Sequence, residues 1–213
     1  MAKTLKEINN ENKISFYIQP IRVKRSVNFD ISKTFEENVS ANFREVYAHC
    51  VEFEVYQGTW KKEIIAKITV VILDEAKRKK DSIELSRVNL INTDAASSFK
   101  YLFDDEEYQK SVGDSASFLC YIDRFYVMPK YRRKGIGTYL LENLPNIIEF
   151  YFNYRVQAIT TYPAPMCLSG ETMTDLQQKR MLTKIKRHFE HVGYREMNRS
   201  NFYIKIYEKE SEN

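Results

Sequence analysis

The first third of the chain alternates apolar and polar residues with the period of a β-strand. Three stretches rich in β-branched and aromatic residues predict strands over residues 14–23, 44–57 and 63–73. A glycine-containing turn at residues 57–59 separates the second strand from the third and predicts an antiparallel hairpin. The basic run at residues 76–80 has no aromatic residue among its cations for base stacking, so we expect a solvated loop there.

In the second half of the chain, the apolar pattern predicts strands that alternate with helices. Strands are expected over residues 115–127, 156–162 and 201–207, and helices over residues 94–108, from 137 onward and over 174–192. Asp94 would cap the first helix, and the capping box formed by Thr174 and Gln177 would begin the last one. Pro145 cannot donate a helical hydrogen bond, so it predicts a kink or a break near Leu144. The expected buried stripe of the last helix is Leu182, Ile185, Phe189 and Val192.

The composition is that of a folded protein. With 43% hydrophobic and 14% aromatic residues the chain is too apolar to be disordered, and 213 residues suit one core better than two. We therefore expect a single domain over residues 1–213. No apolar run approaches the roughly 20 residues that cross a bilayer, and residues 1–8 lack the apolar centre of a signal peptide. These features predict a cytoplasmic protein without a membrane partner.

The cysteines and the net charge narrow the possible classes of protein further. Cys50, Cys120 and Cys167 include no CxxC pair, so the sequence predicts neither a disulfide framework nor a metal site. The net charge of +4, from 33 basic and 29 acidic side chains, does not demand a nucleic-acid partner. The cations gather in two clusters, at residues 77–80 and 130–134, and the second belongs to the segment that carries chemistry.

That segment, residues 125–141, reads FYVMPKYRRKGIGTYLL: a strand end, a basic turn with two glycines, and a helix start. Unpaired backbone N–H groups and the positive end of the helix dipole would meet at this turn, an arrangement that binds phosphate. Gly135 and Gly137 have no side chain to hold a diphosphate away, and the flanking polar groups are Arg132, Arg133, Lys134 and Thr138. Neither a Walker loop nor a dinucleotide fingerprint is present.

Arg132, Gly135 and Gly137 meet the pattern R-x-x-G-x-G, preceded by V-x-P and followed by a Leu-rich helix. This segment resembles the GNAT superfamily of acyl-coenzyme A-dependent N-acyltransferases. The resemblance covers about residues 115–207 and fades over residues 1–110. It implies an α/β (α+β) fold, in which helices flank a mixed, mostly antiparallel sheet. A V-shaped splay would separate the strand that ends at Val127 from the next strand of the sequence.

The resemblance also implies a cofactor and a reaction. Acetyl-coenzyme A would place its diphosphate on the turn and pair its amide-rich pantetheine arm with the strand, like an added strand. The implied cofactor-binding residues are Phe125, Tyr126, Val127, Arg132, Arg133, Lys134, Gly135, Ile136, Gly137 and Thr138. A neutral primary amine would attack the thioester in a ternary complex, and a backbone N–H near Val127 would stabilise the oxyanion.

The proton-transfer residues depart from the family pattern. Where the family often has Glu, this chain has Tyr121, and the nearest carboxylate on the same strand face is Asp123, our preferred base. Where many members have a tyrosine that protonates the leaving thiolate, this chain has Phe189. Tyr194, Tyr162 or a water would replace it, or the thiolate would leave unaided. The candidate catalytic residues are Asp123, Tyr121 and Tyr194.

Three functions remain open. The first is an N-acetyltransferase acting on a small-molecule or protein amine. The second is a non-catalytic acyl-coenzyme A sensor or scaffold, which Tyr121 and Phe189 would allow. The third is a toxin-like acetyltransferase acting on aminoacyl-tRNA, suggested by the basic clusters. The acceptor depends on residues 1–110, the variable acceptor-side part, which would form a lid, a substrate pocket or a homodimer contact.

Overall fold

The computed structural model describes residues 16–25, 48–57, 63–82, 84–90, 92–112, 118–165, 173–197 and 200–207. Within these ranges seven strands form one sheet, in the order β1-β2-β3-β4-β5-β7-β6. The strands are β1 (Phe16–Arg25), β2 (Ala48–Gln57), β3 (Glu63–Asp74), β4 (Phe118–Val127), β5 (Val156–Thr161), β6 (Arg195–Glu196) and β7 (Tyr203–Ile206). All neighbours are antiparallel except β4 and β5, which are parallel. The mixed, mostly antiparallel sheet is therefore confirmed, with β4 at its centre.

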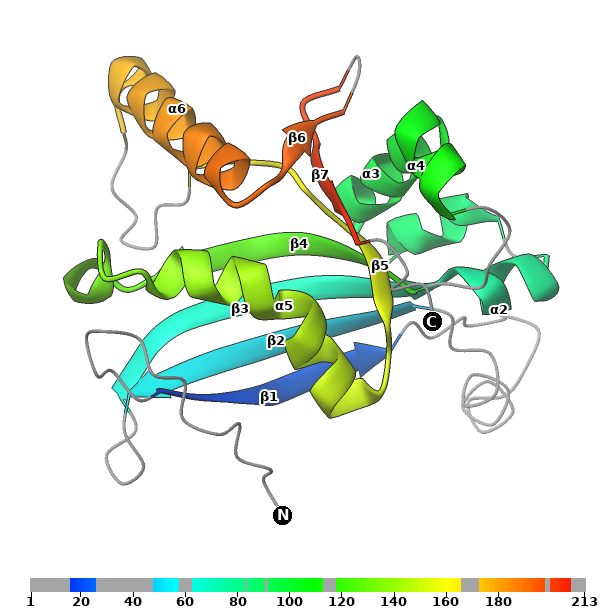
Figure 1. Ribbon diagram of the computed structural model, residues 1–213, viewed down its shortest axis with the longest axis horizontal. Helices are drawn as coiled ribbons and strands as arrows, with labels where there is room; N and C mark the ends of the chain where they lie inside the picture. The colour runs from blue at the N-terminus through cyan, green and yellow to red at the C-terminus, as the bar shows by residue number, and fades with distance from the viewer. Residues whose placement is uncertain are drawn as a thin grey trace, which may run out of the picture.

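Helices cover both faces of this sheet (Figure 1). The α-helices are α2 (Glu75–Lys80), α3 (Thr93–Phe103), α4 (Glu106–Val112), α5 (Ile136–Phe152) and α6 (Asp175–His191), and the 3₁₀ helices are η1 (Leu85–Leu90) and η2 (Pro129–Tyr131). Residues of α5 and α6 share one apolar core with the sheet, whereas η1, α3 and α4 share a second core. None of the described helices combines the length and the apolar character that a membrane-spanning helix needs.

The alternation of side chains along β4 separates these two cores. Cys120 and Ile122 belong to the core that contains α5, while Leu119 and Tyr121 belong to the core that contains α3. All four side chains are at most 2% exposed. A central strand that is covered on both faces needs apolar residues on both, and this is why the sequence of β4 shows little polar alternation.

The basic run after β3 is a helix and not the predicted loop. Helix α2 begins at Glu75 because the Asp74 carboxylate accepts a hydrogen bond from the Lys77 backbone N–H at 2.9 Å. Arg78 bonds back to Glu75, with its Nε 2.6 Å from a carboxylate oxygen. Cations near the C-terminal end of a helix are favoured by the helix dipole, so this charge pattern stabilises the short helix.

The predicted helix over residues 94–108 is two helices. Asn92, and not Asp94, caps α3, because its Oδ1 accepts a hydrogen bond from a first-turn backbone N–H at 2.8 Å. Asp105 interrupts the helical run and starts α4, where its Oδ1 accepts a hydrogen bond from the Tyr108 backbone N–H at 3.0 Å. A cap of this kind stabilises a helix by about 1 kcal/mol.

The two long C-terminal helices, α5 and α6, differ only slightly from the helices predicted from the sequence. Helix α5 runs as one helix across Pro145, so a break near Leu144 is wrong. The predicted capping box of α6 is confirmed. Of the stripe expected to be buried in α6, Phe189 and Val192 are buried, whereas Leu182 and Ile185 are only half-buried. The side of α6 that carries Ile185 borders a cleft and not a continuous core.

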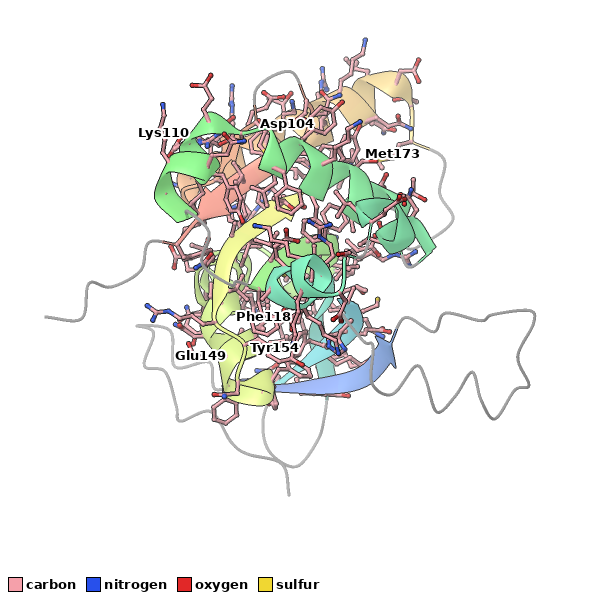
Figure 2. All side chains as sticks on the ribbon, turned by 90° about the vertical axis from the view of Figure 1, so that its right-hand side faces the viewer. Asp104, Lys110, Phe118, Glu149, Tyr154 and Met173 are labelled. Atoms are coloured by element: carbon pink, nitrogen blue, oxygen red, sulfur yellow. The ribbon has the colours of Figure 1, made fainter. Side chains whose placement is uncertain are left out.

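Strands β4 and β5 pair over a short distance and then separate. The ladder runs from Phe118 to Ile122 on β4 and reaches Thr161, where β5 ends, while β4 continues to Val127. At the closed end, Phe118 stacks on Tyr154 with ring centroids 4.1 Å apart (Figure 2). At the other end the two strands diverge (Figure 1), which is the predicted splay.

Candidate active site

A cleft of about 1260 Å³ opens where β4 and β5 separate. Its walls are the second half of β4, the turn that leads into α5, the residues that follow β5, and one side of α6. Pockets for small ligands usually occupy about 300–1000 Å³. The cleft is therefore large enough for an extended ligand that lies along the exposed part of β4.

The turn between β4 and α5 has a backbone shape that leaves N–H groups free. Arg133 and Gly135 have positive φ values of 60° and 77°. Gly135 is the N-cap of α5, and no side chain caps this helix. The N–H groups of its first turn have no intrahelical acceptor, and the positive end of the helix dipole lies among them. An anion in the cleft would contact these free N–H groups and would be attracted by the positive end of the dipole.

Gly137 keeps space between three elements that meet at the cleft. A Cβ at this position would lie 3.4 Å from His188 Nε2 on α6 and 3.7 Å from the Phe125 ring on β4. A Cβ at these distances would make ordinary van der Waals contact, so glycine at this position leaves a small space between α5, α6 and β4. The φ of Gly137 is not in the positive range, so the backbone conformation does not require glycine there.

Contacts with β3 and β4 hold the turn in place. Arg132 Nε donates to the Val127 carbonyl at 2.9 Å, and its guanidinium lies 5.0 Å from the centre of the Tyr126 ring. The Tyr131 hydroxyl donates to the Glu63 carboxylate at 2.6 Å, and Lys130 pairs with the same carboxylate. Hydrogen bonds from Lys130 and Tyr131 lower the pKa of Glu63. These contacts restrain the first half of the turn, residues 130–132, against β3 and β4.

Most of the predicted cofactor-binding residues line this cleft: Phe125, Tyr126, Val127, Arg132, Arg133, Gly135, Gly137 and Thr138. Two of them do not. The ammonium group of Lys134 lies 5.3 Å from the centre of the Tyr131 ring, and the Ile136 side chain is 3% exposed, in the core that contains α5.

The exposed edge of β4 provides a second kind of binding group. Because the ladder with β5 stops at Ile122, the residues from Asp123 to Val127 have no strand beside them on that side. Backbone N–H and C=O groups on an unpaired edge can pair with an amide-rich ligand as with an added strand. This edge leads from the centre of the sheet to the glycine turn.

Asp123 lies at a β-bulge of β4. On β3, Thr69 pairs with Arg124 and Val70 pairs with Ile122, so Asp123 has no partner in this ladder. A bulge of this kind adds one residue to a strand and interrupts the regular alternation, so Phe125 and Val127 pack on the core that contains α5 while Tyr121 packs on the core that contains α3. The Asp123 carboxylate is 22% exposed and lines the cleft.

Two neighbours contact this carboxylate. Asn92, the N-cap of α3, donates from Nδ2 to Asp123 Oδ1 at 2.7 Å. Arg124 Nε lies 3.5 Å from Asp123 Oδ2, and the Arg124 side chain is 68% exposed. The amide contact is short and partly buried, whereas the ion pair is long and faces solvent, so Asn92 is the stronger constraint.

The other two candidate catalytic residues lie outside the cleft. Tyr121 and Tyr194 are each 2% exposed, and neither borders the opening. Burial raises the pKa of both phenols, and the charges of Asp94 and Asp123 raise that of Tyr121 further. Tyr162, which follows β5, is 44% exposed and does line the cleft. The geometry thus favours Tyr162 over Tyr121 and Tyr194 as a phenol that can reach a ligand.

One face of α6 contributes residues that were not among the predicted site residues, although the sequence places His188 close to the site. Arg180, Lys184 and His188 recur every four residues and line the cleft opposite the glycine turn. Residues at this spacing share one side of a helix, so the signal was present in the sequence but was hidden by the expected apolar stripe. Burial lowers the pKa of His188, and the charge of His191 adds to this effect. A neutral imidazole is therefore favoured beside the turn.

The charged side chains that line the cleft are mostly positive. Four of the lining side chains are cations, namely Arg132, Arg133, Arg180 and Lys184, and Asp123 is the lining carboxylate. Such a lining attracts a ligand with several negative charges. Among the described residues, no group of three His, Cys, Asp or Glu side chains could hold a metal ion. The Cys120 thiol is fully buried, and burial raises its pKa, so it offers no accessible nucleophile.

Comparison with known proteins identifies a family. Residues 34–161 match the family model for the Acetyltransferase (GNAT) family. The comparison with curated proteins gave no match. Similar solved structures include a mutant of KacT, with a TM-score of 0.44 and 10% identity over 90% of this chain and 94% of that chain.

Two further solved structures have similar scores. One is AtaT complexed with acetyl-methionyl-tRNAfMet, with a TM-score of 0.43 and 8% identity over 90% of this chain and 95% of that chain. The other is Arabidopsis thaliana NAA60 in complex with acetyl-CoA, with a TM-score of 0.41 and 12% identity over 92% of this chain and all of that chain.

The family match covers more than half of the chain, and it includes β2 to β5 and the whole glycine turn. The splayed sheet, the free helix N-terminus and the cation-lined cleft all lie within or beside the matched region. The chain therefore belongs to the GNAT acetyltransferase family.

Proposed function

We propose that this protein transfers the acetyl group of acetyl-coenzyme A to a primary amine by direct attack in a ternary complex. The observation that carries the proposal is the continuity of one cleft wall. Free N–H groups of the glycine turn, the unpaired edge of β4 and the Asp123 carboxylate follow one another along it. A diphosphate, an amide-rich arm and a reacting amine need these groups in this order.

On the cofactor side, the diphosphate of acetyl-coenzyme A binds at the N-terminus of α5. Backbone N–H groups there supply hydrogen bonds, and Gly135 and Gly137 permit close approach. Arg132 and Arg133 add charge from the turn. Arg180 and Lys184 face them from α6 and complete a cationic mouth. The pantetheine arm then pairs with the β4 edge and carries the thioester toward Asp123.

On the acceptor side, Asp123 accepts a proton from the incoming ammonium group, directly or through water. The neutral amine attacks the thioester carbonyl, and a backbone N–H near Val127 stabilises the oxyanion. The C–S bond breaks as the amide forms, the sulfur leaves as a thiolate, and the attacking nitrogen releases its second proton to the thiolate or to water. A thiol with an ordinary pKa of about 8.5 is a fair leaving group, so the thiolate leaves unaided or takes a proton from Tyr162 or water.

We also propose that residues 1–213 act as one domain. The hairpin of β2 and β3 joins β4 through a long ladder, and side chains from β2, β3, β4 and α5 share one apolar core. The acceptor-side part, residues 1–110, and the cofactor part, residues 115–207, are therefore proposed to work as a unit. A homodimer contact through the acceptor-side part remains part of this proposal.

Aminoacyl-tRNA is a second acceptor class, supported by the charge of α6. Beyond the cleft lining, this helix exposes Lys179 and Arg187 beside Arg180 and Lys184. A continuous basic helix face can bind phosphates, and such binding weakens strongly as salt increases. RNA binding at low salt that is lost at high salt would favour this acceptor over a small-molecule or protein amine.

The proposed function is tested by thiol release from acetyl-coenzyme A with a panel of small amines, peptides with free N-termini and aminoacyl-tRNA. We expect release that depends on one acceptor class and a matching acetylated product. Tight binding of acetyl-coenzyme A without turnover on any acceptor would contradict catalysis and favour an acyl-coenzyme A sensor. Absence of binding would contradict both.

A further inference from the structure

Asn92 connects two parts of the molecule that are distant in the sequence. Its Oδ1 accepts a hydrogen bond from the Ala95 backbone N–H at 2.8 Å, which caps α3. Its Nδ2 donates to Asp123 Oδ1 at 2.7 Å, across 31 residues of sequence. One amide therefore fixes the start of a helix with its oxygen and a carboxylate of β4 with its nitrogen. Replacing the amide oxygen affects the cap of α3, whereas replacing the amide nitrogen affects Asp123.

Asp123 needs such a constraint because of its place in the strand. It sits at a β-bulge, without a partner on β3, and the ladder to β5 has already ended at Ile122. The ion pair with Arg124 is 3.5 Å long and involves a mostly exposed side chain, which provides little restraint. The short bond from Asn92 is the contact that selects one orientation of the carboxylate.

The bond from Asn92 also leaves the carboxylate able to accept a proton. A carboxylate has about four acceptor sites, and Asn92 occupies one of them at Oδ1. The amide is neutral, so it directs the carboxylate without cancelling its charge as a buried cation would. Oδ2 has only the long contact with Arg124, and the Asp123 side chain lines the cleft.

We propose that Asn92 is a positioning residue that holds the Asp123 carboxylate toward the acceptor amine. The inference rests on the proposed function, with Asp123 as the base. Asn92 touches neither the glycine turn nor the cationic mouth of the cleft, so its effect falls on the chemical step and not on acetyl-coenzyme A binding. A change of about 1 Å in the position of a reacting group can reduce a rate about 100-fold.

Three variants separate the two roles of this amide. Asn92→Ser retains a side-chain oxygen for the helix cap and removes the amide group that donates to Asp123, because the serine side chain is shorter and has no Nδ2. Asn92→Ala removes both. Asn92→Asp retains the cap and places a second carboxylate against the first. We expect kcat to fall about tenfold to 100-fold in the first two variants and further in the third, with the KM for acetyl-coenzyme A unchanged in all.

A cap elsewhere in the chain supplies the matched control. Asp74 caps α2 with its Oδ1 2.9 Å from the Lys77 backbone N–H, and it does not line the cleft. Asp74→Ala should lower the melting temperature as Asn92→Ala does but leave kcat unchanged. Asn92→Ser should show the opposite result, with a small change in melting temperature and a lower kcat. A kcat loss that follows melting temperature across the set would overturn the inference.

A double-mutant cycle with Asp123→Asn is the deciding experiment. If Asn92 acts through Asp123, Asn92→Ser should reduce kcat in the wild-type background and have no further effect in the Asp123→Asn background. Equal reductions in both backgrounds would contradict this inference alone and leave the proposed function standing. Absence of turnover by the wild-type protein with every amine would contradict the proposed function, and the inference with it.

Discussion

The two ends of the cleft, for which we propose cofactor binding and proton transfer and which we name accordingly, are built in different ways. The cofactor end consists mainly of backbone, contributed by one continuous segment from Phe125 to Thr138. The proton-transfer end consists of side chains that come from separate segments, as the contact between Asn92 and Asp123 illustrates. The first end depends on local conformation, and the second depends on how distant elements pack. The two should therefore respond differently to substitution.

The largest expected effect is at the backbone end. Gly135→Asp should abolish measurable binding of coenzyme A, because its carboxylate would face the diphosphate. Two unit charges about 4 Å apart repel by about 4 kcal/mol near a protein surface, which is about 1000-fold in affinity. Calorimetric titration of the variant measures this loss.

Gly193→Asp is the matched control for Gly135→Asp. Gly193 also has a positive φ, of 88°, but it lies at the end of α6 next to the Lys205 side chain and outside the cleft. It carries the same backbone strain without a diphosphate nearby, so coenzyme A affinity should be retained. Equal loss in both variants would mean that the effect is strain and not repulsion, and the comparison would fail.

The next effect is at the side-chain end. Asp123→Asn should reduce kcat about 100-fold to 10,000-fold, the usual contribution of a general base, with coenzyme A affinity unchanged. Steady-state kinetics and calorimetry on the same preparation give both values. If coenzyme A affinity fell together with kcat, the two ends of the cleft would not act independently. An unchanged kcat would remove Asp123 from the mechanism.

A smaller effect is expected at Arg132, which belongs to the backbone end but acts through its side chain. Arg132→Ala should weaken coenzyme A binding by roughly 1.5–3 kcal/mol, the usual value for a hydrogen bond to a charged group. The side chain also donates to the Val127 carbonyl, so the turn loses a restraint as well as a charge. Arg132→Lys keeps the charge and loses the bond, and it should recover part of the affinity. No recovery would assign the effect to the restraint alone.

The smallest effect concerns the α6 wall. Removing both Arg180 and Lys184 should weaken coenzyme A binding several-fold, because exposed ionic contacts contribute about 0–1 kcal/mol each. The loss should disappear at high salt, where such contacts are screened. Lys179→Ala with Arg187→Ala is the matched control, since these α6 cations do not line the cleft. If both double variants lose the same amount of coenzyme A affinity, the effect comes from the overall positive charge of α6 and not from contacts made by Arg180 and Lys184.

The contrast between the two ends also explains what could be predicted from the sequence. The turn could be recognised because Arg132, Gly135 and Gly137 follow a fixed spacing in the sequence. The positive φ of Gly135 gives a local reason for glycine at that position. The strands on either side were predicted because burial on both faces leaves a clear apolar signature. Their pairing order required the family resemblance, since nothing local states which strands are neighbours.

The proton-transfer end was only partly predictable for the opposite reason. The alternation of β4 placed Tyr121 and Asp123 on one face, but it could not show that Tyr121 is buried and that Asp123 lies at a bulge. Asn92 gave no signal as a partner of Asp123, because their contact exists only after α3 packs on the sheet. Tyr194 is in the core beside Phe189 and not in the cleft, which depends on the packing of α6.

A structure of the protein with coenzyme A bound tests the central claim most directly. We expect the diphosphate oxygens within hydrogen-bond distance of the backbone N–H groups at the start of α5, with the pantetheine arm along β4 and the sulfur near Asp123. A diphosphate held elsewhere, with the start of α5 free of ligand, would contradict the account.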